Sequence, residues 1–158
     1  MADLLWEEVK DLFDTEMNGV LPDVCVPDTS TEDWQAVFDL VRSKGWRHEY
    51  SVDGIPLRLP AAELVLSLRD EASPRLKVWP HPEVLVIFRP YAEESVDFDV
   101  DLRELQGQER LDVLCAFLRA IGGRLGKPVV MTPEGGPEHP VLGFDVTTGR
   151  VVLMAELR

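Results

Sequence analysis

Three strand-length runs between residues 75 and 102 constrain the fold more than any other feature of the chain. They read RLKVWP, EVLVIFRP and SVDFDVDL, and β-branched and aromatic residues recur in them. His81-Pro82 and the segment 91–94 separate the runs, which suggests an antiparallel meander. The middle run is nearly continuous in apolar residues, so we expect it to be central and covered on both faces. The alternation of the third run predicts one face in water.

Helical periodicity is clear in three places. Residues 3–16 have an amphipathic pattern that ends at Asn18-Gly19, with an apolar side made of Leu5, Val9, Leu12 and Phe13. A second helix should begin after Ser30, an N-cap with Asp33 three residues on, and end at Gly45. Its apolar face consists of Trp34, Val37, Phe38 and Val41.

The broadest apolar stripe predicts a main core helix over 108–125. The stripe contains Leu111, Leu114, Cys115, Leu118 and Ile121. Gly122-Gly123 should loosen its last turn. A shorter helix over about 61–71 is also predicted, with Pro60 as its first residue, although LVLSL in this segment suits a strand equally well.

The remaining segments indicate further strands. A short one is expected over 24–26, and Asp53-Gly54 inside WRHEYSVDGIPLRLP predicts a hairpin with a type I′ turn. Near the C-terminus PVVMT, PVLGFDV and RVVLMAEL suggest three strands, the last two joined at Thr148-Gly149.

This order of elements predicts an α+β fold in which helices pack on a mainly antiparallel or mixed sheet, in two layers. It lacks the regular βαβ alternation of a parallel sheet. A chain of 158 residues with 45% hydrophobic content is long enough for one core and short for two. We therefore expect a single globular domain over 1–158.

The charge balance limits the classes of partner. Sixteen Lys and Arg face 29 Asp and Glu, a net charge of −13, which opposes binding to a phosphate backbone. Nucleic acid is therefore not an expected partner, whereas a basic protein is. The start MADLLWEEVKDLF does not resemble a secretory signal, and no apolar run reaches the roughly 18 residues of a membrane span. Two cysteines without CxxC spacing favour the reducing cytoplasm.

SVDFDVD spaces three carboxylates about 7 Å apart along one strand face: Asp97, Asp99 and Asp101. A solvated face that discourages edge-to-edge aggregation is the common outcome for such a strand. A cation site would need further oxygen ligands, and no EF-hand loop supplies them, so no metal is predicted. The stretch becomes a candidate partner-binding surface because more acids flank it, namely Glu93, Glu94 and Glu104.

The loop PEGGPEHP, residues 133–140, is the best candidate for a surface loop with a function. Its polar residues Glu134, Glu138 and His139 could serve as acid or base beside a pocket. The three histidines of the chain show neither HxxxH nor HExxH spacing, which opposes a zinc site.

No motif for a cofactor or a nucleophile is present. Gly126-Lys127 is followed by Pro128 and comes after a helix, unlike a phosphate-binding loop. Cys25 and Cys115 have no nearby positive charge to lower a thiol pKa. We therefore expect a non-enzymatic cytoplasmic protein-binding module with an acidic surface, of inhibitor or immunity type. The alternatives are a small-molecule- or metal-dependent enzyme with a pocket near 133–140, and a structural domain that forms homodimers through the edges of EVLVIFR and RVVLM.

The start of the chain resembles that of the SUKH immunity superfamily. Trp6, Val9 and Leu12 on the first predicted helix are followed by Leu21-Pro22-Asp23. The resemblance covers under a fifth of the chain, and a strand ending at Pro27 is predicted where that family continues with a helix. It implies toxin neutralisation as one role for a binding protein and assigns no membership.

Overall fold

One antiparallel sheet with nine strands runs through the computed structural model, which describes residues 2–136 and 139–154. The strand order is β3-β2-β4-β5-β6-β1-β7-β8-β9. The strands are β1 (Asp23–Pro27), β2 (Arg47–Val52), β3 (Ile55–Leu57), β4 (Pro74–His81), β5 (Val84–Phe88), β6 (Ser95–Asp99), β7 (Val129–Thr132), β8 (Leu142–Asp145) and β9 (Arg150–Leu153).

Helices separate groups of consecutive antiparallel strands and do not alternate regularly with single strands, so the predicted α+β class is confirmed. They are α1 (Trp6–Val9), η1 (Lys10–Phe13), α2 (Thr15–Asn18), α3 (Thr31–Lys44), α4 (Ala62–Ser67), η2 (Leu102–Glu104) and α5 (Gln108–Leu125). Within the described ranges, no helix is both long and apolar enough to cross a membrane.

The strand nearest the N-terminus lies in the middle of the sheet. β1 pairs with β6 on one side and with β7 on the other, antiparallel to both. It thereby joins two meanders that are far apart in sequence, β4-β5-β6 and β7-β8-β9. Since β6 and β7 both oppose β1, they point the same way, and α5 carries the chain from one to the other.

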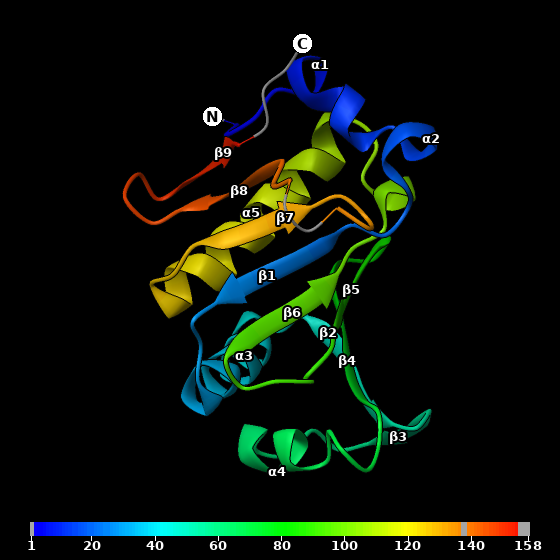
Figure 1. The fold of residues 1–158 in the computed structure, drawn as a ribbon, viewed down its shortest axis with the longest axis vertical. Helices are drawn as coiled ribbons and strands as arrows, with labels where there is room; N and C mark the ends of the chain where they lie inside the picture. Colours follow the sequence, from blue (N-terminus) through cyan, green and yellow to red (C-terminus); the bar gives the residue numbers. More distant parts are fainter. Residues whose placement is uncertain (1, 137–138, 155–158) are drawn as a thin grey trace.

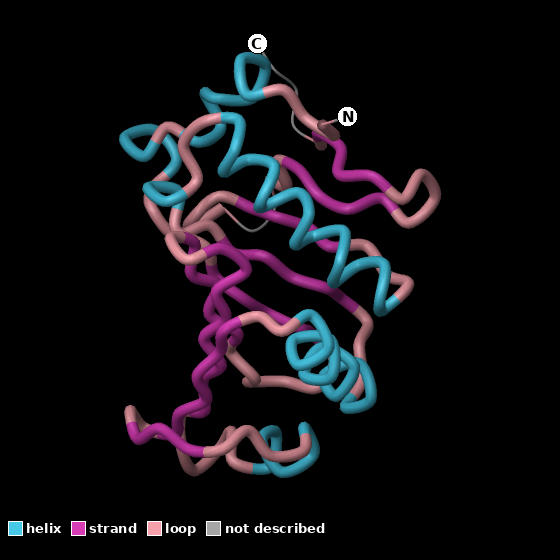
Figure 2. The backbone as a smooth tube through the Cα atoms, turned by 180° about the vertical axis from the view of Figure 1, so that it is seen from behind, coloured by secondary structure: helices cyan, strands magenta, loops and turns pink. Residues whose placement is uncertain are grey.

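The long helices α3 and α5 cover one face of this sheet. α3 and α5 pack behind β1, β6 and β7 in Figure 1 and lie in front of them in the reverse view of Figure 2. Side chains on that face are fully buried, including Trp34, Phe88, Phe98 and Phe117. The rings of Phe88 and Phe98 lie 4.9 Å apart and those of Phe98 and Phe117 5.5 Å. On the opposite face of the sheet, toward the viewer in Figure 1, no helix of the described residues lies over the strands.

The strand β5 differs from expectation although its neighbours are as predicted. It is interior, between β4 and β6, but it buries only alternate residues. Leu85 and Ile87 are half-buried on the open face, because neighbouring side chains on an uncovered sheet shield one another only partly. The sequence EVLVIFR is therefore not an edge strand available for self-association.

The predicted helix over 3–16 is instead three short turns. Asp14 is extended and its Oδ1 accepts a hydrogen bond from the backbone N–H of Glu16 at 2.9 Å, so it ends η1 and caps α2. Such local side-chain bonds compete with continuous helix. Leu5, expected inside, is 53% exposed, and Leu4 is buried in its place.

Local signals elsewhere are confirmed. Ser30 and Asp33 form the predicted capping box, and Gly45 ends α3 with a φ of 68°. Asp53 and Gly54 have φ angles of 51° and 81°, as the hairpin between β2 and β3 requires. The ambiguous segment 61–71 contains the helix α4, which is shorter than predicted and begins beyond Pro60.

Gly122 is required by close packing on α5, whose bounds, Gln108–Leu125, are those predicted for the main core helix. A Cβ at Gly122 would come within 2.8 Å of the Phe144 ring. Gly122→Ala should therefore lower the free energy of unfolding by about 1–3 kcal/mol, measured by urea denaturation. Gly123→Ala is the control: nothing lies within 4 Å of its Cβ, so stability should rise by up to about 1 kcal/mol. Equal effects would contradict the packing role.

Candidate functional site

A hollow of about 540 Å³ lies on the open face of the sheet, over β1, β6 and β7. Tyr91, from the connection between β5 and β6, also lines it, together with the apolar side chains of Pro27 and Val130. Its polar and charged lining includes Asp23, Cys25, Arg89, Asp97, Asp99 and Thr132.

Strand register brings the acidic residues together. Asp23 on β1 lies directly opposite Asp99 on β6, and Cys25 lies opposite Asp97. Because side chains alternate along a strand, all four point to the same face, while Val24 and Phe98 point to the core. Three carboxylates thus gather across two neighbouring strands.

Only one cation faces these carboxylates among the described lining residues. Arg89 Nε donates to Asp99 Oδ2 at 2.5 Å. Asp97 accepts a hydrogen bond from the Ser95 hydroxyl at 2.9 Å. Neither Asp97 nor Asp23 forms an ion pair within the part of the chain that the structure describes. The hollow is therefore rich in uncompensated negative charge.

The electrostatic cost falls on Asp23. Partial burial raises the pKa of its carboxyl, and repulsion by and hydrogen bonding to Asp99 raise it further. The charges of Asp97 and Glu134 act in the same direction. Burial and like charges thus both oppose ionisation of Asp23, and carboxyls perturbed in this way cluster at functional sites.

Cys25 adds a neutral thiol to the hollow. Its Sγ lies 3.1 Å from the Ser95 hydroxyl oxygen. Burial raises the pKa of this thiol, the Ser95 hydrogen bond partly offsets that effect, and Asp97 raises it again. A thiol kept protonated is a poor nucleophile. Cys115 is buried on α5 as predicted, and burial raises its pKa to about 12.

Asp101, the third aspartate of SVDFDVD, has a different role from the other two. β6 ends at Asp99, and Asp101 caps the short helix η2. Its carboxylate accepts hydrogen bonds from the Arg103 backbone at 2.9 Å and the Arg103 guanidinium at 2.7 Å. These bonds outweigh partial burial and lower its pKa. Its charge is thus already paired.

The three flanking glutamates bond to neighbouring segments and are not among the residues that line the hollow. Glu93 accepts a hydrogen bond from the Thr31 hydroxyl at 3.0 Å, next to the start of α3. The Glu94 carbonyl accepts from the backbone N–H of Thr29 at 3.1 Å. Glu104 accepts from the backbone N–H of Leu85 at 2.9 Å.

The loop after β7 borders the hollow without lining it in the described residues. Glu134 is exposed, and its Oε2 accepts from the Val20 backbone N–H at 3.3 Å. His139 is also exposed, and its backbone N–H donates to the Gly136 carbonyl at 3.1 Å. Glu138 lies outside the described residues.

Asp23 and Arg89 are site residues that sequence patterns did not identify. The alternation in DVCVP is a signal in the sequence that places Asp23 and Cys25 on the same face of one strand. Nothing in the sequence, however, places β1 beside β6, because the two strands are about 70 residues apart and their pairing depends on the whole sheet.

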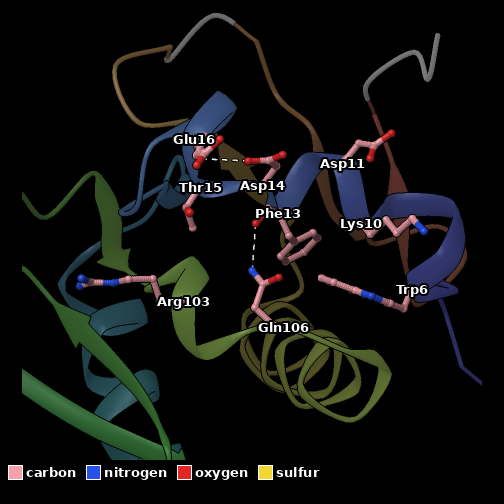
Figure 3. Close-up of a pocket in the computed structure, with 9 residues that line it drawn as sticks. All are labelled: Trp6, Lys10, Asp11, Phe13, Asp14, Thr15, Glu16, Arg103 and Gln106. Atoms are coloured by element: carbon pink, nitrogen blue, oxygen red, sulfur yellow. Dashed lines mark hydrogen bonds between the residues drawn. The ribbon is translucent and has the colours of Figure 1, made fainter.

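A second hollow, of about 620 Å³, lies beside the N-terminal turns (Figure 3). Trp6 packs on Phe13 with ring centroids 5.4 Å apart, and Gln106 Nε2 donates to the Phe13 carbonyl at 2.9 Å. Lys10 and Arg103 also line this hollow, and Arg103 extends away from the two rings in Figure 3. Both cations already pair, with Glu7 and Asp101 respectively. This hollow is therefore the weaker candidate.

No group of three or more His, Cys, Asp or Glu within the described ranges is placed to hold a metal ion. The hollow on the open sheet face remains the stronger candidate because three carboxylates gather in it. Comparison with the profiles of protein families, with curated proteins and with solved structures finds no match for this chain.

Proposed function

We propose that the chain is a protein-binding module whose open sheet face receives a basic segment of a partner protein. The observation that carries the proposal is that Asp23 and Asp97, without ion pairs among the described residues, face one hollow of about 540 Å³. An inhibitor or immunity factor for a basic protein is the role that this chemistry suits.

A cationic side chain in the hollow would relieve the repulsion between carboxylates. Asp99 is occupied by Arg89, which leaves Asp23 and Asp97 as the carboxylates for the incoming group. Apolar groups such as Val130 and Pro27 would cover the methylene stem of a lysine or arginine. The net charge of −13 would also attract a basic protein over longer distances.

The proposal predicts salt-sensitive binding of a lysine-rich peptide, measured by titration calorimetry beside the same peptide with glutamine in place of lysine. The wild-type chain should bind the lysine peptide, and high salt should weaken it. The double substitution Asp23→Asn with Asp97→Asn should weaken binding by about tenfold or more, since it removes both unpaired carboxylates.

Glu63→Gln with Asp70→Asn is the matched control. It removes the same charge from exposed positions on and after α4, outside the hollow. If this control weakens binding of the lysine peptide as much as Asp23→Asn with Asp97→Asn does, binding depends on net charge alone and the proposed site is wrong. Circular dichroism melting checks that each variant is folded.

A further inference from the structure

The two edges of the sheet are protected in different ways. β3, at one edge, is three residues long and contains Pro56, which has no N–H to donate. A short strand with proline resists pairing with another chain. β9, at the other edge, has no proline, and the N-terminal segment lies beside it in both Figure 1 and Figure 2.

The backbone of β9 shows which groups face outward. The N–H of Met154 donates inward to the Val141 carbonyl at 2.9 Å. Because backbone groups alternate along an antiparallel strand, Val151 and Leu153 direct their N–H and C=O away from β8. The outward N–H of Val151 donates to a side chain, Asp3 Oδ2, at 2.9 Å.

Asp3 is held firmly at this edge. Arg119 Nη1 on α5 donates to the same Oδ2 at 2.6 Å, and Arg150 Nε lies 3.5 Å from Oδ1. Gln108 fastens the next residues, donating to the Leu4 carbonyl at 3.0 Å and accepting from the Trp6 N–H at 2.7 Å. The carboxylate therefore occupies the position where a tenth strand would bond.

We propose that the Asp3 carboxylate blocks strand pairing at the edge strand β9, and that the β9 strands of two copies pair antiparallel when this carboxylate is removed. The outward residues suit such pairing. Under a two-fold axis, Val151 of one copy faces Leu153 of the other, and each such pair exchanges both backbone hydrogen bonds. The surface is separate from the acidic hollow, whose described lining contains no residue of β9.

The test is the oligomeric state of the full chain, measured by sedimentation equilibrium. Asp3→Ala should lower the dimer dissociation constant at least about tenfold relative to wild type, the equivalent of about one net hydrogen bond. Asp11→Ala removes an exposed carboxylate from the same N-terminal segment and should leave the wild-type value unchanged. Leu153→Pro added to Asp3→Ala removes an outward donor and should restore the wild-type value.

Two results would overturn the proposal. One is an Asp3→Ala chain that is folded by circular dichroism and associates no more than wild type. The other is an Asp3→Ala dimer that persists unchanged with Leu153→Pro, because pairing would then use another surface. If Asp3→Ala does not fold, Asp3→Leu, which keeps a side chain of similar size but has no oxygen to accept the Val151 N–H, is judged by the same two criteria.

Discussion

Trp34→Ala should cost about 3–5 kcal/mol of unfolding free energy, the largest loss that we expect from one side chain. Trp34 is fully buried on α3, and its ring packs edge-on against Phe38 and Phe88 at centroid distances of 6.1 and 6.3 Å. Alanine would leave a cavity between the helix and the sheet. The loss is a large share of the roughly 5–15 kcal/mol by which domains are stable.

Trp34 also fixes the connection that borders the hollow. Its Nε1 donates to the Ala92 carbonyl at 2.9 Å, next to Tyr91. Trp34→Phe keeps an aromatic ring but leaves that carbonyl without its partner, so a smaller loss of about 1–3 kcal/mol is expected. Urea denaturation gives both values.

Trp79→Ala serves as the control for Trp34. Trp79 is half-buried on the open face, where the Arg47 guanidinium lies 4.4 Å from its ring centroid. Its truncation should cost clearly less than that of Trp34. A similar loss for the two tryptophans would mean that the aromatic core around Trp34 is not the main source of stability.

Asp3→Asn is expected to cost about 1.5–3 kcal/mol at neutral pH, through the loss of charged hydrogen bonds. Burial raises the pKa of Asp3, but the Val151 N–H, the Arg119 hydrogen bond and the charges of Arg119 and Arg150 together hold it below its ordinary value. A depressed carboxyl pKa contributes stability above the pKa of the unfolded chain. That contribution disappears as the pH falls through the lower, folded pKa.

The difference in unfolding free energy between wild type and Asp3→Asn should therefore shrink on acidification. The effect of Asp23→Asn on the free energy of unfolding should have the opposite sign to that of Asp3→Asn. Because the folded pKa of Asp23 is raised, its ionised form destabilises the fold at neutral pH, so asparagine should increase stability there. This gain should vanish below the unfolded pKa, where Asp23 is protonated in both states. Urea denaturation at several pH values checks both, and a pH-independent difference for Asp3→Asn would contradict the ion-pair account.

If Asp23→Asn stabilises the fold and also weakens binding of the lysine peptide, the Asp23 carboxylate lowers stability but contributes to binding. Such an exchange of stability for binding is common at functional sites. A stabilising Asp23→Asn without effect on the peptide would instead leave the repulsion as a cost of folding unrelated to the proposed function.

Local signals in the sequence were sufficient for most of the elements. The capping box at Ser30, the Asp53-Gly54 turn and the stripe of α5 depend on contacts within a few residues, so short-range pattern predicts them. The prediction of one continuous first helix was wrong because helical periodicity does not show that Asp14 caps a new turn.

The sequence by itself determined the class of fold, the alternation that turns Asp97 and Asp99 to one face of β6, and the surplus of acidic residues. Only the tertiary structure decided that β1 lies between β6 and β7, because strand pairing over long separations depends on the balance of all contacts in the sheet. That placement brings Asp23 opposite Asp99. It also makes β9 an edge, where Asp3, distant in sequence, supplies the missing hydrogen-bond acceptor.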